Sequence, residues 1–88
     1  MDKVIISYNE IISTIISGLD LDEGSVNIDT KSQDLVEWDS LGHLTLLMKL
    51  DEKFDDITEK IPELASATSV KEIISLIKKS DTKYKLGE

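Results

Sequence analysis

Apolar residues recur at helical intervals in three stretches of this 88-residue chain, and no stretch shows the alternation typical of a half-buried strand. The first stretch runs from Lys3 to Leu19, where only Ile6 lies off the apolar face. The second runs from Leu41 to Phe54. In the third, apolar positions repeat at i, i+3, i+4 and i+7: Val70, Ile73, Ile74 and Ile77. The pattern predicts three main helices that bury one face each.

The segments between these helices predict the remaining architecture. Residues 20–39 lack sustained periodicity, but they contain apolar anchors that we expect to hold an ordered crossover over the bundle: Val26, Ile28, Leu35, Val36 and Trp38. Pro62 is expected to open one short helical turn through "PELASA". Ser69 and Glu72 have the spacing of a capping box. We therefore predict an all-α four-helix domain over residues 1–80, with a loose tail at 81–88.

Composition excludes several classes of function. The chain has no cysteine and one histidine, His43, so thiolate metal sites and most zinc sites are excluded. The net charge of −8 disfavours binding to a phosphate backbone. No apolar run is long enough to span a bilayer, and the N-terminus lacks the apolar core of a signal peptide. We expect a monomeric cytoplasmic protein that binds neither nucleic acid nor membrane.

Two further site types are rejected from residue spacing. The segment "DLDEGSVNIDTK" has acids at the first and third positions of a calcium loop. However, Ser25 stands where that loop needs glycine, and Lys31 stands where it needs glutamate. Ser40 has no G-x-S-x-G elbow, and His43 is predicted to point toward the core side of the helix. A serine hydrolase is therefore not expected.

The helix predicted at Leu41–Phe54 carries two apolar stripes. One is a core face formed by Leu46, Leu47, Leu50 and Phe54. The other has i, i+3, i+7 spacing, and acids flank it on the helical wheel. Its members are Leu41, Leu44 and Met48, with Asp51, Glu52 and Asp55 alongside. A domain with three main helices has difficulty burying both stripes, so the second is interpreted as a contact site for other proteins.

Ser40 stands at the start of this helix, after Asp39, within "EWDSLGHL". Either residue can cap the helix, and capping alone is sufficient to explain them. A hydroxyl at this position is also well placed to carry a phosphate ester, because helix N-termini favour negative charge.

The sequence around Ser40 resembles the acyl carrier protein family, through "DSL" at the head of a long apolar helix in a small acidic domain. The resemblance extends from about Val4 to Lys79 and includes the long crossover, the "IP" before the short helix and the "TSV" before the last helix. The broader "WDSLGHL" is similar to free-standing carriers of specialised pathways. Fatty-acid carriers typically have "GADSLD", with an acid where this chain has Gly42.

The resemblance implies a function. A phosphopantetheinyl transferase would attach 4′-phosphopantetheine from coenzyme A to Ser40, and Asp39 would help to position the metal ion used during transfer. The thiol of the arm would carry acyl or aminoacyl groups as thioesters, so the chain would be a carrier for fatty-acid, polyketide or related biosynthesis and not an enzyme. Partner enzymes with basic docking surfaces would contact a set of residues on the second main helix: Leu41, Leu44, Met48, Asp51, Glu52 and Asp55.

Two alternatives stay open at the level of sequence. The first is a peptidyl or D-alanyl-type carrier that is loaded by an adenylating enzyme. The second is an acidic protein-interaction module that is never modified. The sequence does not define the cargo or the role of His43.

Overall fold

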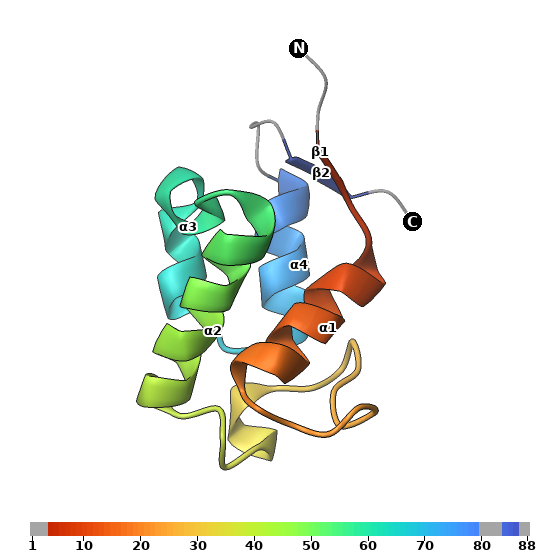
Figure 1. Cartoon of the computed structure of the whole chain (residues 1–88), viewed down its shortest axis with the longest axis vertical. Coiled ribbons are helices and arrows are strands. Elements are labelled where there is room, and N and C mark those ends of the chain that lie inside the picture. The colour runs from red at the N-terminus through yellow and green to blue at the C-terminus, as the bar shows by residue number, and fades with distance from the viewer. Residues whose placement is uncertain (1–3, 80–83, 87–88) are drawn as a thin grey trace.

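The computed structural model describes residues 4–79 and 84–86, and within this part the chain is mainly helical (Figure 1). Four α-helices are present in the described residues: α1 (Tyr8–Gly18), α2 (Ser40–Phe54), α3 (Ile57–Lys60) and α4 (Val70–Lys79). None of them is long and apolar enough to cross a membrane. The prediction of three main helices and a short one in a small helical domain is confirmed at this level.

Helix α1 begins at Tyr8, five residues later than the periodicity predicted. Ser7 ends the preceding segment with a capping box, in which the Glu10 N–H donates to Ser7 Oγ and the Ser7 N–H donates to Glu10 Oε1. Residues 4–6 form strand β1 (Val4–Ile6) instead. Ile6, which lay off the predicted helical face, is fully buried. The helical prediction was wrong here because three consecutive β-branched residues precede the cap.

Strand β1 pairs in parallel with β2 (Tyr84–Leu86), so Val4 lies opposite Tyr84 and Ile6 opposite Leu86. The loose tail predicted at 81–88 is therefore corrected for residues 84–86, while 81–83 and 87–88 lie outside the described residues. Three-residue strands carry too little alternation to be recognised in a sequence. The pairing brings the two ends of the described chain together at one end of the molecule (Figure 1).

The core lies between α1, α2 and α4. Helices α1 and α2 pack closely because Gly18 lacks a side chain: a Cβ there would lie 2.9 Å from the Cα of Leu46. Fully buried side chains line the contact from each helix, including Ile11 and Ile15 of α1, Leu46 and Leu50 of α2, and Val70, Ile73 and Ile77 of α4. The helical periodicity of the sequence thus identified the buried faces correctly.

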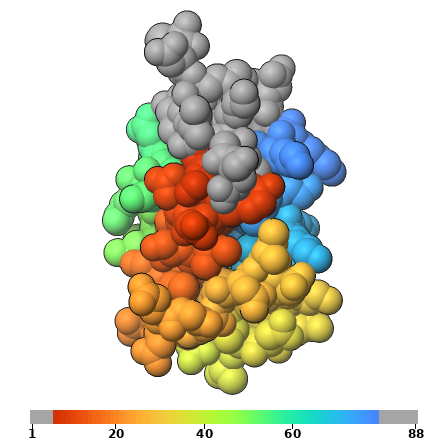
Figure 2. All heavy atoms as spheres, turned by 90° about the vertical axis from the view of Figure 1, so that its right-hand side faces the viewer, coloured from red at the N-terminus to blue at the C-terminus, as the bar shows by residue number. Residues whose placement is uncertain are grey.

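The crossover between α1 and α2 is ordered and closes one end of the bundle below α1 (Figure 2). Val26 and Trp38 are buried and anchor it as predicted. Val36 does not anchor it, because its side chain is 91% exposed, and Ile28 is also exposed at 39%. The Trp38 N–H donates to the Leu35 carbonyl, which makes a turn whose central residues, Val36 and Glu37, are both exposed.

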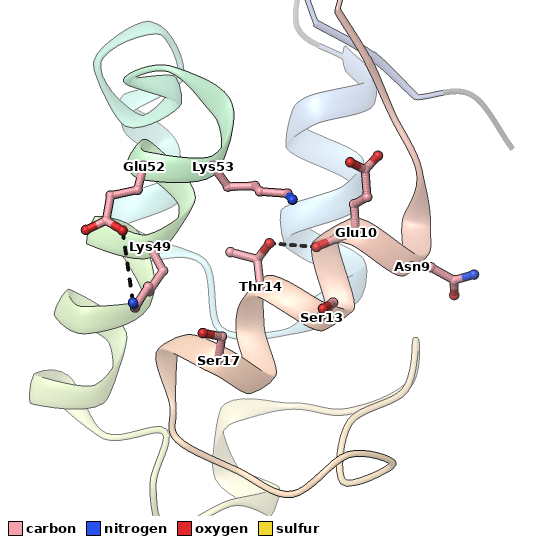
Figure 3. A pocket seen from close by; sticks show the side chains of 8 residues that line it. All are labelled: Asn9, Glu10, Ser13, Thr14, Ser17, Lys49, Glu52 and Lys53. Atoms are coloured by element: carbon pink, nitrogen blue, oxygen red, sulfur yellow. Dashed lines mark hydrogen bonds and ion pairs between the residues drawn. The ribbon is translucent and has the colours of Figure 1, made fainter.

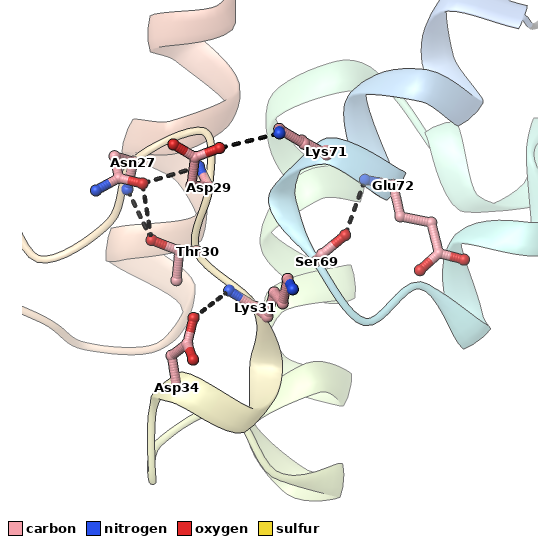
Figure 4. Close-up of polar contacts among 8 residues, drawn as sticks. All are labelled: Asn27, Asp29, Thr30, Lys31, Asp34, Ser69, Lys71 and Glu72. Carbon is pink, nitrogen blue, oxygen red and sulfur yellow. Dashed lines mark hydrogen bonds and ion pairs between the residues drawn. The ribbon is translucent and has the colours of Figure 1, made fainter.

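Backbone contacts fasten the crossover to the start of α4. The Val70 N–H donates to the Thr30 carbonyl at 3.0 Å, and the Ser32 N–H donates to the Thr68 carbonyl at 2.7 Å. Figure 4 shows the surrounding polar contacts, including the ion pair between Lys71 Nζ and Asp29 Oδ1 at 3.0 Å. These contacts explain how a twenty-residue connection stays ordered without a long helix of its own.

The predicted capping box at α4 forms in part. The Glu72 N–H donates to Ser69 Oγ at 3.0 Å, as expected. The Glu72 carboxylate, however, accepts from the N–H and the hydroxyl of Thr68 instead of from the Ser69 N–H. Pro62 opens the predicted short turn as a 3₁₀ helix, η2 (Pro62–Ser66), and α3 lies before it.

Candidate functional site

The candidate site is the first turn of α2. Ser40 is the first helical residue and its side chain is exposed. Asp39 is the N-cap, with Oδ1 accepting from the Gly42 N–H at 2.8 Å. The capping that the sequence left open between the two residues therefore belongs to Asp39. Because Asp39 performs this task, the hydroxyl of Ser40 is not needed to cap the helix.

The exposed stripe of α2 extends from Ser40 along the helix. Leu41, Leu44 and Met48 are 72%, 56% and 58% exposed, whereas Leu46, Leu50 and Phe54 are buried. Leu47 is half-buried against the core. The two faces predicted from the helical wheel are therefore separated in the structure. Three large apolar side chains remain in contact with solvent beside the serine.

The acids predicted to flank the stripe differ in their surroundings. Asp51 is half-buried and accepts both the Thr58 N–H, at 2.8 Å, and the Thr58 hydroxyl, at 2.7 Å. It therefore fixes the first turn of α3. Glu52 is exposed and lies 4.0 Å from Lys49 Nζ. Asp55 is exposed at the end of α2, where it adopts a left-handed backbone conformation. The structure thus gives Asp51 an internal role that spacing did not reveal.

A hollow of about 430 Å³ lies beside Ser40. The head of α2 and the residue before its cap form one wall, and residues 65–68, at the end of η2, form another. Its lining residues are Ser32, Trp38, Asp39, Ser40, His43, Ala65, Ser66, Ala67 and Thr68. The lining combines hydroxyl groups and the Asp39 carboxylate with an indole, an imidazole and two alanine methyl groups, so it suits a chain that is partly polar and partly apolar.

A second hollow, of about 510 Å³, lies between α1 and α2 (Figure 3). Ser13 and Ser17 of α1 and Lys49 of α2 are among the residues that line it, and Lys53 extends from α2 toward α1. Of the predicted site residues, only Glu52 lies here. The lysines of α2 therefore occupy a different side of the helix from Leu41, Leu44 and Met48.

Two residues near Ser40 have structural roles that sequence reasoning missed. A Cβ on Gly42 would lie 2.0 Å from the carbonyl oxygen of Glu37, so the turn before α2 requires glycine there. His43 bonds through both ring nitrogens, to the Trp38 indole and to the Leu64 carbonyl, each at 3.0 Å. With both nitrogens engaged, His43 is not placed to act as a base for Ser40. The glycine in "WDSLGHL" was the one available signal of the close approach.

Among the described residues, no group of three or more His, Cys, Asp or Glu side chains is arranged to hold a metal ion. Searches of protein-family models, of curated proteins and of solved structures found no match to the chain.

Proposed function

We propose that this chain is an acyl carrier protein, in which Ser40 bears a 4′-phosphopantetheine arm and Leu41, Leu44 and Met48 contact partner enzymes. The chain would be a substrate of those enzymes and would not itself catalyse a reaction. The proposal rests above all on one observation: Ser40 is exposed at the head of a fifteen-residue helix whose cap is supplied by Asp39.

The residues around Ser40 fit the proposed arm. The first turn of a helix favours a negatively charged group, as a phosphodiester would be. The neighbouring hollow has hydroxyl groups for the amides and the hydroxyl of pantetheine, and it is open to the surface beside Ser40. The arm supplies a thiol, which the chain itself lacks, and this thiol forms thioesters with acyl groups.

The attachment step is a substitution at the phosphorus that bears pantetheine, with the serine oxygen as the nucleophile. Ser40 Oγ forms a bond to the phosphorus of coenzyme A that bears pantetheine, and the bond from this phosphorus to the bridging oxygen of the diphosphate breaks. The adenosine 3′,5′-bisphosphate portion leaves, and the hydroxyl proton passes to a base of the transferase. Asp39 would help to hold the metal ion, through the carboxylate oxygen that does not accept from the Gly42 N–H.

The exposed stripe supports the partner part of the proposal. Three large apolar side chains in a row beside an attachment site favour a protein contact, and methionine adapts to more than one partner surface. The chain's net charge of −8 favours partners with basic surfaces. Glu52 and Asp55, which are exposed, are the acids best placed to contribute.

Intact mass spectrometry tests the attachment. The purified chain is incubated with coenzyme A, Mg²⁺ and a broad-specificity phosphopantetheinyl transferase. We expect the mass to increase by one phosphopantetheine group, and we expect no increase in Ser40→Ala. Ser66→Ala is the matched control, because Ser66 lines the same hollow and is also exposed.

The outcomes separate the proposal from its alternatives. No mass gain in the wild-type chain contradicts the carrier function and favours an unmodified interaction module. A gain that persists in Ser40→Ala contradicts the assigned attachment site. If the gain is observed, incubation of the modified chain with an adenylating enzyme and candidate amino acids distinguishes an aminoacyl carrier from an acyl carrier.

A further inference from the structure

The hydrogen bonds of His43 define the protonation state of its ring. The indole Nε1–H of Trp38 can only donate, so His43 Nδ1 accepts at this 3.0 Å contact. The carbonyl oxygen of Leu64 can only accept, so His43 Nε2 carries a hydrogen and donates at 3.0 Å. His43 is therefore a neutral imidazole with its proton on Nε2.

These two bonds join three separate parts of the chain. Trp38 is buried in the crossover, two residues before Ser40. His43 is half-buried in the first turn of α2, and Leu64 is buried in η2, 21 residues further along the chain. The Leu64 carbonyl also accepts from the Ala67 N–H at 3.2 Å, so the same oxygen holds both His43 and the end of η2.

The joined segments are the two walls of the hollow beside Ser40. Trp38, Ser40 and His43 form one wall, and the residues that follow Leu64, from Ala65 to Thr68, form the other. The His43–Leu64 contact is a hydrogen bond between α2 and η2. The imidazole therefore adds a polar link between the two walls to the packing of buried apolar side chains.

We propose that His43 is a positioning residue for the modification of Ser40. It holds the crossover before Ser40 and the end of η2 at the separation that admits the pantetheine chain of coenzyme A next to the hydroxyl. This proposal rests on the carrier function proposed above. A neutral Nε2–H imidazole is required, because each of its two partners has a fixed hydrogen-bonding polarity.

Three variants separate the two bonds. His43→Asn places an amide oxygen near the position of Nδ1 and retains an acceptor for Trp38. His43→Gln places an amide N–H₂ near the position of Nε2 and retains a donor for Leu64. His43→Leu replaces the imidazole with an apolar side chain of similar size and removes both hydrogen bonds. Trp38→Phe serves as a check on the first bond, since it removes the indole N–H and preserves an aromatic ring.

The kinetic readout is modification of Ser40 by the transferase at saturating coenzyme A, with the carrier chain as the varied substrate so that its kcat and KM are obtained separately. A small misplacement of a reacting group can cost on the order of 10²-fold in rate. We expect His43→Leu to lower kcat/KM by at least about tenfold, mainly through kcat, and we expect His43→Asn and His43→Gln each to recover part of the loss. In a Trp38→Phe background, His43→Gln should add little, because the bond it removes is already absent.

Nuclear magnetic resonance tests whether the two hydrogen bonds of His43 form, independently of whether they affect the modification of Ser40. In the wild-type chain, the imidazole ¹⁵N signals should show a proton on Nε2 and none on Nδ1. The Trp38 indole N–H should exchange with solvent faster in His43→Gln, which removes its acceptor, than in His43→Asn, which retains one. The amide signals of residues 65–68 should shift more in His43→Asn than in His43→Gln, because only His43→Asn removes the donor to Leu64. A different tautomer overturns the proposal whatever the chain's activity.

The kinetic results are equally decisive. If His43→Leu is folded, shows the altered Trp38 signal and is still modified at the wild-type rate, the residue is merely structural and the proposal is wrong. If the wild-type chain is not modified at all, the carrier function and the positioning role both fail, while the hydrogen-bonded tie itself is still judged by the spectra.

Discussion

At Gly42 the helix α2 closely approaches the turn that precedes it. The carbonyl of Glu37 would lie 2.0 Å from a Cβ at this position, and Leu19 Cδ2 would lie 3.1 Å away. The backbone carbonyl belongs to a turn that is tied down by the buried Trp38, so it has little freedom to retreat. No side chain therefore fits at this position without moving the turn.

We predict that Gly42→Ala destabilises the fold, although alanine normally stabilises a helix by about 1 kcal/mol relative to glycine. The steric conflict should exceed this gain and lower the free energy of unfolding by about 1–3 kcal/mol, measured by urea denaturation. Thr45→Ala, at an exposed position of the same helix, should change it by less than about 0.5 kcal/mol. A Gly42→Ala chain as stable as the wild type would show that the turn moves freely.

Helix α2 has two faces with separate roles. Its buried face holds the core through Leu46, Leu50 and Phe54, and its exposed stripe begins next to Ser40. Periodicity revealed both faces because each follows the helical repeat. Spacing along one helix says nothing about partners from elsewhere in the chain. For that reason the bonds from Asp51 to Thr58 and from His43 to Leu64 were not predicted.

Substitutions on the exposed stripe should affect docking and leave folding almost unchanged. We predict that Met48→Glu or Leu44→Asp weakens binding to the transferase by more than about 1 kcal/mol, measured by titration calorimetry. The free energy of unfolding should change by less than about 0.5 kcal/mol, because both side chains are mostly in solvent.

Leu46→Ala is the control on the opposite face and should lower the free energy of unfolding by about 2–5 kcal/mol. An equally large loss of stability in Met48→Glu would show that the stripe belongs to the core.

Asp51 lies in α2, and we expect its side chain to stabilise the neighbouring helix α3. Its carboxylate accepts two hydrogen bonds from Thr58, and Asp56, the residue before α3, makes no side-chain capping bond. We predict that Asp51→Ala lowers the free energy of unfolding by about 1–2 kcal/mol and speeds amide hydrogen exchange at residues 57–60. Glu52→Ala should have little effect on either measurement, because its ion pair with Lys49 is exposed. Unchanged exchange in α3 after Asp51→Ala would contradict this role.

In the molecule as a whole, the helical part of the domain could be predicted from the sequence, whereas the pairing of the two short strands could not. The three apolar faces follow from periodicity. The β1–β2 pair joins residues 80 positions apart, and short strands of this kind leave no local pattern. Val36 was misjudged for a related reason: its apolar character suggested an anchor, but the turn at Leu35–Trp38 directs it into solvent.

The net charge gives a prediction for the whole chain. Screening of the −8 charge should slow association with a basic transferase, so we expect the association rate constant to fall by about tenfold or more from low to high salt, measured by stopped-flow fluorescence. The same salt should slightly raise the free energy of unfolding, because it screens repulsion among the acids and because the Lys49–Glu52 and Lys71–Asp29 ion pairs are exposed. An association rate independent of salt would argue against charge-steered docking.

The parallel pair β1–β2 also matters for how the protein is handled. Both strands lie at one pole of the molecule, whereas α2 begins with Ser40 at the opposite pole (Figure 1). A fluorescent dye, an affinity tag or a solid support coupled through either terminus should therefore leave the serine pole facing outward. A chain immobilised in this way can be presented to a series of soluble enzymes in turn.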